Sequence, residues 1–517
     1  MSKIVTRYLI NVYPMKKLLF MLITGLLGPG AFAQQKPNVV IIYADDAGYG
    51  DLSCYGATKV KTPNLDRLAK SGIRFTNGHA TSATCTPSRF ALITGRYPWR
   101  KTGTGVLPGN AAMIVPVGQP TLPSMMRKAG YKTGLVGKWH LGLGDGKEID
   151  WNEDIKPGPN EVGFDYSFFF PATADRVPTV FVENGRVQGL DKNDPITVNY
   201  KEKVGNEPTG KENPELLKMQ ASHGHNNTIV NGIGRIGFMK GGQKARWADE
   251  ELAYAFTDKA EQFIEENHRH PFFLYFALSD IHVPRMPATA FKGKSGLGYR
   301  GDAILEMDWM VGRIMEKLKA LGLEKNTLVI FSSDNGPVLD DGYVDEAVTM
   351  QNGHQPLGPL RGGKYSAFEG GTRVPWIVSW PAGVKAGQTS DALISQVDLF
   401  ASFAKMTGQP LGATDAPDSF DMLGALLGKT QKGRDWLILQ GGPLSLVQGD
   451  LKYISPSNGQ KLMKEVNVES GNDSAPQLYD LKKDVGEKQN IAAEHPEKVK
   501  EMAAMLEKLK EADKTRK

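Results

Sequence analysis

The chain has 517 residues and a mass of 56.5 kDa, more than one ordinary hydrophobic core accommodates, so we expect two packed units. Hydrophobic residues make up 40% and charged residues 23%, which excludes a disordered chain or a collagen-like repeat. The two cysteines, Cys54 and Cys85, are too few for a disulfide framework or a cysteine-rich zinc site. The formal net charge of +5 raises the question of a polyanionic partner.

Residues 1–33 have the three parts of a secretory signal peptide. They contain four basic residues and no acidic one, an apolar run at 18–27 that is too short to span a bilayer, and small residues ending at Ala33. Met15 offers an alternative start, and a buried N-terminal helix is the competing interpretation. We predict export to the periplasm or medium without a membrane anchor. Residues 34–517 then carry a net charge of +1, so we expect no nucleic-acid partner.

Apolar runs alternate with helical patterns along the next three hundred residues. The runs at 38–44, 133–137, 271–277 and 326–331 are typical of buried strands, and 62–72 and 305–321 have the spacing of helices. This alternation predicts an α/β fold with a large, mainly parallel sheet flanked by helices, in a catalytic domain of residues 34–412. Shorter alternating segments and an amphipathic helix from Pro496 predict a smaller C-terminal α+β domain over 413–517.

Each predicted strand ends in a cluster of polar residues. These clusters are Asp45 and Asp46, Lys138 and His140, Asp280 and His282, and Asp334 and Asn335. Any one of them could be a turn or a helix cap. In open α/β sheets, however, sites form at the carboxyl ends of the strands, so four such clusters predict one shared active site.

Three other features carry less information. Residues 201–227 form a polar loop or insertion that is either a solvated segment or a substrate-facing one. We do not expect a metal site at its His223 and His225. The G-x-G-x-x-G pattern at 232–237 lacks the strand and helix that a dinucleotide site needs. Cys54 is interpreted as a small buried residue.

The segment 85–96, CTPSRFALITGR, is the most informative part of the sequence. It places a cysteine just before a predicted helix, whose N-terminus favours anions, with Arg89 nearby. The segment resembles the type I sulfatase signature C-x-P-S-R-x-x-x-L/I-T-G-R. Segments 37–51, 137–142, 333–336, 360–375 and 477–481 also resemble blocks of that family. The chain is therefore similar to the formylglycine-dependent sulfatases of the alkaline phosphatase superfamily.

This resemblance implies a modified nucleophile and a metal ion. A maturation enzyme would oxidise Cys85 to formylglycine, whose hydrate attacks the sulfur of a sulfate ester. The implied metal ligands are Asp45, Asp46, Asp334, Asn335 and the modified Cys85. All of these donors are oxygens, which suits Ca²⁺, with Mg²⁺ as second choice.

The resemblance also implies catalytic roles for five further residues. Arg89 and Lys138 would stabilise the alkoxide, and His140 would accept the second proton of the hydrate. His282 would protonate the leaving oxygen, assisted by Lys364, which also binds sulfate. Histidines suit these tasks because they titrate near neutral pH.

The expected substrate is an O-sulfate on a carbohydrate, cleaved in exo fashion, with galactose or N-acetylgalactosamine sulfates as the leading guess. The region around Thr173, Asp175 and Arg176 matches the family loosely and could contact the sugar. Arg285 stands where many relatives carry a second histidine, which we expect to change substrate contacts.

Two alternatives remain open from the sequence. One is a phosphodiester or phosphonate ester hydrolase of the same superfamily. The other is a non-catalytic glycan-binding relative, against which the retained Lys138, His140, His282 and Lys364 argue.

Overall fold

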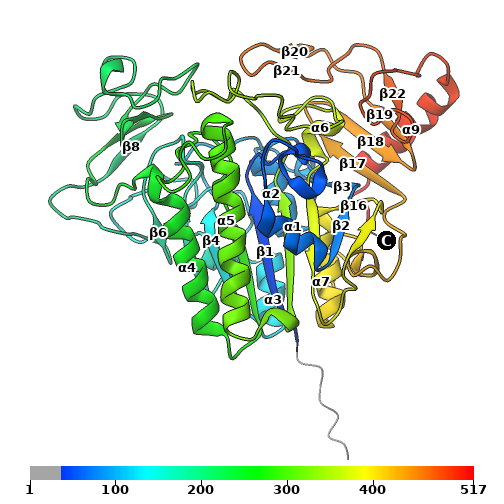
Figure 1. Ribbon diagram of the computed structural model, residues 1–517, viewed down its shortest axis with the longest axis horizontal. Coiled ribbons are helices and arrows are strands. Elements are labelled where there is room, and N and C mark those ends of the chain that lie inside the picture. The colour runs from blue at the N-terminus through cyan, green and yellow to red at the C-terminus, as the bar shows by residue number, and fades with distance from the viewer. Residues whose placement is uncertain (1–35, 517) are drawn as a thin grey trace, which may run out of the picture. The chain divides into compact units, whose positions relative to one another are not determined.

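The computed structural model describes residues 36–516, so the predicted signal peptide lies outside the described residues. Within 36–516, every helix is too short or too polar to cross a membrane. The chain builds a ten-stranded sheet with helices on both faces and a separate four-stranded antiparallel sheet (Figure 1). The predicted α/β class with a smaller C-terminal α+β part is thereby confirmed.

The large sheet has the strand order β15-β2-β14-β13-β1-β12-β4-β5-β6-β7. Its strands are β1 Asn38–Ala44, β2 Ile73–Phe75, β4 Lys132–Lys138, β5 Tyr166–Phe170, β6 Val182–Glu183, β7 Arg186–Val187, β12 Phe272–Ala277, β13 Thr327–Ser333, β14 Trp376–Ser379 and β15 Gln388–Ser390. The four predicted strands are β1, β4, β12 and β13, each within one or two residues of its expected bounds.

The centre of this sheet is a parallel block of five strands. Neighbours pair in parallel from β13 through β1, β12 and β4 to β5. The strands next to this block, β14 and β6, run antiparallel to it. All five central strands therefore end at the same edge of the sheet, and this edge carries the residues discussed below.

Alternating side chains of the central strands feed two separate apolar cores. In β1, Val39, Ile41 and Tyr43 join the core on one face, and Val40 and Ile42 join the core on the other. Helices α2 Cys85–Thr94, α3 Leu122–Lys128 and α7 Leu399–Thr407 cover the first face. Helices α1 Pro63–Lys70, α4 Leu252–Asn267 and α5 Gly298–Ala320 cover the second, where α4 and α5 lie side by side (Figure 1).

Helix α5 begins earlier than the pattern at 305–321 predicts. Its first turns contain Arg300 and Asp302, which are polar yet buried. Arg300 pairs with Asp51 at 2.6 Å, and Asp302 accepts hydrogen bonds from the loop before the helix. Paired charges replace apolar residues on the inner face of these first turns. The helical spacing of apolar residues in the sequence therefore starts one to two turns after the helix itself.

The C-terminal sheet contains β17 Trp436–Gln440, β18 Leu444–Gln448, β19 Leu451–Ile454 and β22 Gln477–Asp480. The amphipathic helix α9 Pro496–Glu511 packs on it through Met502 and Leu506. The edge strand β17 also exchanges backbone hydrogen bonds with residues 81–83, just before α2. The boundary between residues 412 and 413 stays a prediction and falls between α7 and β17.

The remaining strands and α-helices are short. They are β3 Gly78–His79, β8 Thr197–Asn199, β9 Ile229–Val230, β10 Ile233–Gly234, β11 Phe238–Lys240, β16 Ile394–Ser395, β20 Leu462–Met463, β21 Val468–Glu469, α6 Glu369–Thr372 and α8 Leu423–Leu426. The glycine pattern at 232–237 begins in the turn of the β9–β10 hairpin and ends just before strand β11. It thus lacks the strand–turn–helix context of a dinucleotide site.

Candidate active site

Carboxylate and amide side chains meet where β1 and β13 end. Asp45 and Asp46 follow β1, and Asp334 and Asn335 follow β13. The backbone N–H of Asp46 donates to Asp334 Oδ1 at 3.3 Å, and Asn335 Nδ2 donates to Asp46 Oδ1 at 2.7 Å. All four residues are buried. The parallel pairing of β1 with β13 thus brings together four of the five predicted metal ligands, the fifth being Cys85.

This cluster has oxygen atoms to offer to a cation. Asp45 Oδ1 and Asn335 Oδ1 are buried and have no hydrogen-bond partner among the described residues. Burial and the neighbouring carboxylate of Asp334 raise the pKa of Asp45 well above its usual range. A divalent cation would satisfy both oxygens and offset the repulsion. The donor set therefore fits a hard cation.

The cluster also lies near His282. Possible ligand atoms of Asp45, Asp46 and His282, one from each, lie within 4.8 Å of one another, close enough to bind the same metal ion. The His282 nitrogen nearest to Asp46 is 3.9 Å from its Oδ2. The two buried atoms without a hydrogen-bond partner, however, are the oxygens of Asp45 and Asn335.

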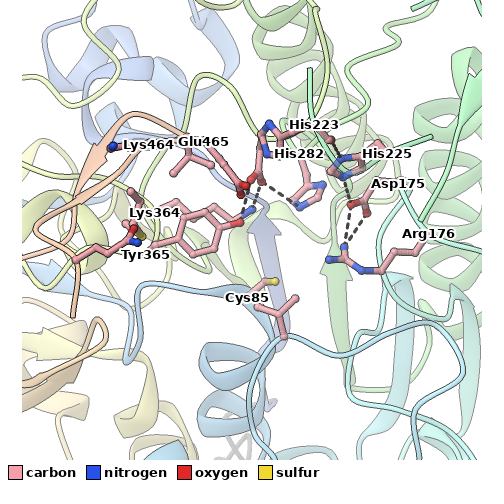
Figure 2. Close-up of a pocket in the computed structure, with 15 residues that line it drawn as sticks. Cys85, Asp175, Arg176, His223, His225, His282, Lys364, Tyr365, Lys464 and Glu465 are labelled. Carbon is pink, nitrogen blue, oxygen red and sulfur yellow. Dashed lines mark hydrogen bonds and ion pairs between the residues drawn. The ribbon is translucent and has the colours of Figure 1, made fainter. Parts of the chain in front are cut away.

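Cys85 is the first residue of α2 and lies on the cavity next to this cluster (Figure 2). Ser88 holds the turn before it, since its Oγ donates to Ser82 O at 2.9 Å and accepts from Ser82 N at 3.1 Å. Burial raises the pKa of the Cys85 thiol, and the ammonium groups of Lys138 and Lys364 offset part of the rise. The position is thus both enclosed and electropositive.

Arg89 and Lys138 neutralise the inner carboxylates. One turn after Cys85, the guanidinium of Arg89 donates twice to Asp334 Oδ2, at 2.8 and 3.0 Å. Lys138, at the end of β4, places Nζ 2.5 Å from Asp45 Oδ2. Both side chains are fully buried. Two fixed positive charges therefore lie beside the carboxylates and the nucleophile position.

Lys364 bridges two carboxylates, one of which the sequence did not indicate. Its Nζ donates to Asp46 Oδ2 at 2.9 Å and to Asp341 Oδ2 at 2.7 Å. Although burial opposes it, Asp341 and Asp46 raise the pKa of Lys364 well above its usual range. The hydroxyl of Tyr365 donates to Asp341 Oδ1 at 2.9 Å. Asp341 therefore fixes both residues on this side of the cavity.

The two predicted catalytic histidines are held as defined tautomers. The Nε2 of His140 lies 2.9 Å from Leu107 O, so Nε2 carries hydrogen and donates to it. The Nδ1 of His140 is buried and has no partner among the described residues. Burial and Lys138 lower the pKa of His140 well below its usual range. His140 is therefore a neutral base with a free lone pair on Nδ1.

His282 has the opposite tautomer. Its Nδ1 donates to Val283 O at 2.7 Å, which leaves Nε2 for the cavity. Burial, Lys364 and Lys138 lower its pKa well below the usual range. Nε2 lies 3.9 Å from Asp46 Oδ2 and 4.0 Å from Asp341 Oδ2.

Asp175 and Arg176 line the opposite wall of the cavity (Figure 2). Arg176 Nη1 donates to both oxygens of Asp175, at 2.8 and 3.0 Å, and to Thr173 Oγ1 at 2.5 Å. Thr173 is buried behind the arginine and does not line the cavity. Of the three predicted substrate contacts, the structure thus brings two to the cavity surface.

The polar insertion reaches the same wall. His225 Nε2 lies 2.9 Å from Asp175 Oδ2, and its Nδ1 lies 2.8 Å from His223 O. Although burial opposes it, Arg176 and His225 hold the pKa of Asp175 well below its usual range. Of the two interpretations of residues 201–227, the substrate-facing one therefore agrees with the geometry.

The whole cavity has a volume of about 620 Å³. Val106, Gln460 and four residues of the β20–β21 hairpin also line it, namely Met463, Lys464, Glu465 and Val466. The sequence carried no signal for this hairpin, because its residues belong to no motif. Asp341 could have been suspected from its position shortly after the block at 333–336.

Two minor expectations need correction. Arg285 is buried and donates to Ile281 O, Val338 O, Leu339 O and Asp345 Oδ2, so it ties the turn after β12 to the segment after β13. Its role is structural, and it does not line the cavity. Cys54 is half-buried rather than buried, because the turn at 53–55 lies at the edge of the core, and burial raises its pKa to about 12.

Comparisons with known proteins agree with this geometry. The family model described as Sulfatase matches residues 37–409. An N-acetylgalactosamine-6-O-sulfatase of Bacteroides thetaiotaomicron is 56% identical over 478 residues, which cover 92% of this chain and 93% of that protein. Human steryl-sulfatase is 32% identical over 456 residues, which cover 80% of this chain and 74% of that protein.

A solved structure matches nearly the whole fold. It is a Bacteroides thetaiotaomicron protein named 6S-sulf, from the metabolism of glycosaminoglycans, with 55% sequence identity and a TM-score of 0.91. The match covers 92% of this chain and 100% of that chain.

Proposed function

Because the chain belongs to the sulfatase family and is a sulfuric ester hydrolase, we propose that it removes 6-O-sulfate from N-acetylgalactosamine residues of a glycan. The observation that carries this proposal is the 56% identity to an N-acetylgalactosamine-6-O-sulfatase over 92% of the chain. Identity near 32% extends to a steryl-sulfatase, so family membership alone does not fix the substrate.

We propose that Cys85 is converted to formylglycine by a maturation enzyme and that Asp45, Asp46, Asp334 and Asn335 hold Ca²⁺. The hydrated aldehyde would supply the oxygen nucleophile, and the cation would bind the negative charge that develops at sulfate. Calcium is preferred over magnesium because Ca²⁺ accepts larger and less regular sets of oxygen ligands. The two orphaned oxygens, on Asp45 and Asn335, support this assignment.

The chain's own groups would then move the protons. Arg89 and Lys138 provide fixed positive charge beside the nucleophile position. His140 would accept a proton at its free Nδ1, which burial keeps neutral. His282 would deliver a proton from Nε2 to the leaving sugar oxygen. An anionic substrate offsets the charges of Lys364 and Lys138, which raises the pKa of His282 when the substrate binds.

Substrate recognition is assigned to the opposite wall. The Asp175 carboxylate and the Arg176 guanidinium offer acceptor and donor groups to sugar hydroxyls, and His225 holds the carboxylate in place. Leaving the polar groups of Asp175 and Arg176 without hydrogen-bond partners in the cavity costs free energy. We therefore expect tight binding only of a sugar whose hydroxyl groups match their positions. Export is part of the proposal, with the leader 1–33 removed after Ala33, as N-terminal sequencing of the protein from cells would test.

The test is a desulfation screen with the protein produced alongside a formylglycine-generating enzyme. The 6-sulfates of N-acetylgalactosamine, galactose and N-acetylglucosamine, the 4-sulfate of N-acetylgalactosamine, and a matched phosphate ester are compared by product mobility. We expect the highest kcat/KM for N-acetylgalactosamine 6-sulfate. Preference for the 4-sulfate or for phosphate would refute the proposal, provided that mass analysis shows Cys85 to be modified.

A further inference from the structure

The cavity that contains Cys85 has one wall made by a hairpin distant in sequence. Strands β20 and β21 form this hairpin, and its tip, residues 463–466, lines the cavity together with Gln460. In Figure 2 the labelled Lys464 and Glu465 lie on the side opposite to Asp175 and Arg176, with Cys85 and His282 between them. The cavity therefore continues past the catalytic residues towards this tip.

The hairpin is tied to the segment that carries Lys364. The guanidinium of Arg361 donates to both carboxylate oxygens of Glu469, each at 2.8 Å. The hydroxyl of Ser366 donates to Glu469 O at 2.6 Å. Because Arg361 and Ser366 flank Lys364, the hairpin is anchored relative to Lys364 at its base, through Glu469. It can serve as a wall of the binding site.

The tip carries charges that the protein itself does not neutralise. Lys464 and Glu465 are exposed, and neither makes an ion pair or a side-chain hydrogen bond with any residue of 36–516. By contrast, Lys461 at the base of the same hairpin pairs with Asp473 at 2.5 Å. Lys464 also lines a neighbouring cavity on the side of Pro337 and Leu357. Because its ammonium group is unpaired and sits on a flexible four-carbon stem, it can turn to a ligand in the cavity that contains Cys85.

The size of the cavity exceeds the need of one sugar. Pockets of roughly 300–1,000 Å³ accommodate ligands of drug size, and a sulfated disaccharide has about as many non-hydrogen atoms as such a ligand. The cavity of about 620 Å³ lies in the middle of that range. One sulfated hexosamine next to Cys85 leaves room towards the tip for a second ring.

We propose that the hairpin tip forms a second sugar subsite, in which Lys464 binds the acidic group of the residue that follows the sulfated sugar in the chain. This inference rests on the proposed function. The ligand is an acidic disaccharide unit whose neighbouring ring bears a carboxylate or a sulfate. Glu465 lies beside Lys464 and weakens the same contact, so the two residues act with opposite sign.

The experiment measures kcat/KM for three saccharides. These are N-acetylgalactosamine 6-sulfate, a disaccharide that joins it to a uronic acid, and the same disaccharide with the carboxyl group reduced to an alcohol. We expect Lys464→Gln to lower kcat/KM for the acidic disaccharide by about 2- to 5-fold, the range for one exposed ion pair, and to leave the other two unchanged. A disaccharide with a sulfate in place of the carboxylate distinguishes the two acidic groups.

Two further variants test the effect of the opposite charge and serve as a control. Glu465→Gln is expected to raise kcat/KM for the acidic disaccharide, and Lys461→Gln to leave it unchanged, because Lys461 is paired and does not line the cavity. The effects of Lys464→Gln and Glu465→Gln should both shrink in high salt.

Equal losses on all three saccharides in Lys464→Gln, or no loss on any, would overturn the subsite. Failure of the proposed function gives a different result. The protein without any substitution, with Cys85 converted to formylglycine, would then be inactive on every saccharide of the set. That outcome overturns the subsite as well, and no variant is needed to recognise it.

Discussion

Asp341→Asn tests the part of the site that only the structure identifies. Asp341 holds the ammonium of Lys364 at 2.7 Å and the hydroxyl of Tyr365 at 2.9 Å, and all three lie on the cavity. Asp46, the other partner of Lys364, belongs to the proposed calcium site. Asp341 is therefore the carboxylate that remains to position Lys364 when a cation is bound.

The magnitude follows from the bond that is lost. Hydrogen bonds to charged groups contribute about 1.5–3 kcal/mol. Asparagine keeps an oxygen for Tyr365 but turns an N–H donor towards the Lys364 ammonium, so the charged contact disappears. If Lys364 binds sulfate, kcat/KM should fall by about 10- to 150-fold, since ~1.36 kcal/mol corresponds to a factor of ten.

The assay is kcat/KM on N-acetylgalactosamine 6-sulfate, with equal formylglycine content in all samples. Asp340→Asn is the matched control, because the neighbouring Asp340 contacts Ser222, Gly342 and His223 but not Lys364. A folded Asp341→Asn variant within threefold of the parent would refute the reasoning about Lys364. Equal losses in both variants would point to a general disturbance of this segment instead.

Four further predictions concern Cys85, the metal site, Lys452 and His79. Cys85→Ala should abolish turnover in protein made with a maturation enzyme, and measurable turnover would contradict the nucleophile assignment. Chelation should lower both activity and Tm, and added Ca²⁺ should restore both. The Asp334→Ala variant should be inactive, and its Tm should not respond to Ca²⁺. An active Asp334→Ala protein would exclude the metal site. Lys452→Met should destabilise the fold by about 3–5 kcal/mol in denaturant titrations, because Lys452 bridges Glu369 and Glu487 at 3.0 Å and all three are buried. Lys498→Met, which breaks the exposed pair with Glu501, should change stability by less than about 1 kcal/mol. Burial lowers the pKa of His79 to about 4, so unfolding below pH 6.5 adds a proton to it, and stability should fall between pH 6.5 and 4. His79→Gln should flatten that decline by up to about 3 kcal/mol, and an unchanged pH dependence would refute the burial argument.

The sequence predicted those parts of the molecule in which one physical signal dominates. Continuous apolar runs marked β1, β4, β12 and β13, because strands buried on both faces have little room for polar residues. The start of α5 escaped prediction, since the paired Arg300 and Asp51 are buried charges that look like surface residues in a pattern. Polar clusters at the strand ends indicated the site because parallel strands end at one edge.

The rest of the cavity depends on contacts between distant segments, which no local pattern encodes. Asp341 becomes part of the site only through its contact with Lys364, and His225 only through its contact with Asp175. The hairpin tip with Lys464 reaches the cavity from the C-terminal part of the chain. Such residues are ordinary polar residues until the fold brings them together.

The two groups of residues differ in how their positions are held. Asp45, Lys138 and Asp334 lie at or directly after strands whose register is fixed by pairing in the centre of the sheet. His225 and Lys464 lie on loops outside that block, where insertions and substitutions disturb few backbone hydrogen bonds. In the proposed function, the carboxylate ligands and Lys138 are therefore held by strand ends, and the sugar is recognised by loops. A change of substrate in this fold can then proceed through the loops alone, without moving the residues that cleave the ester.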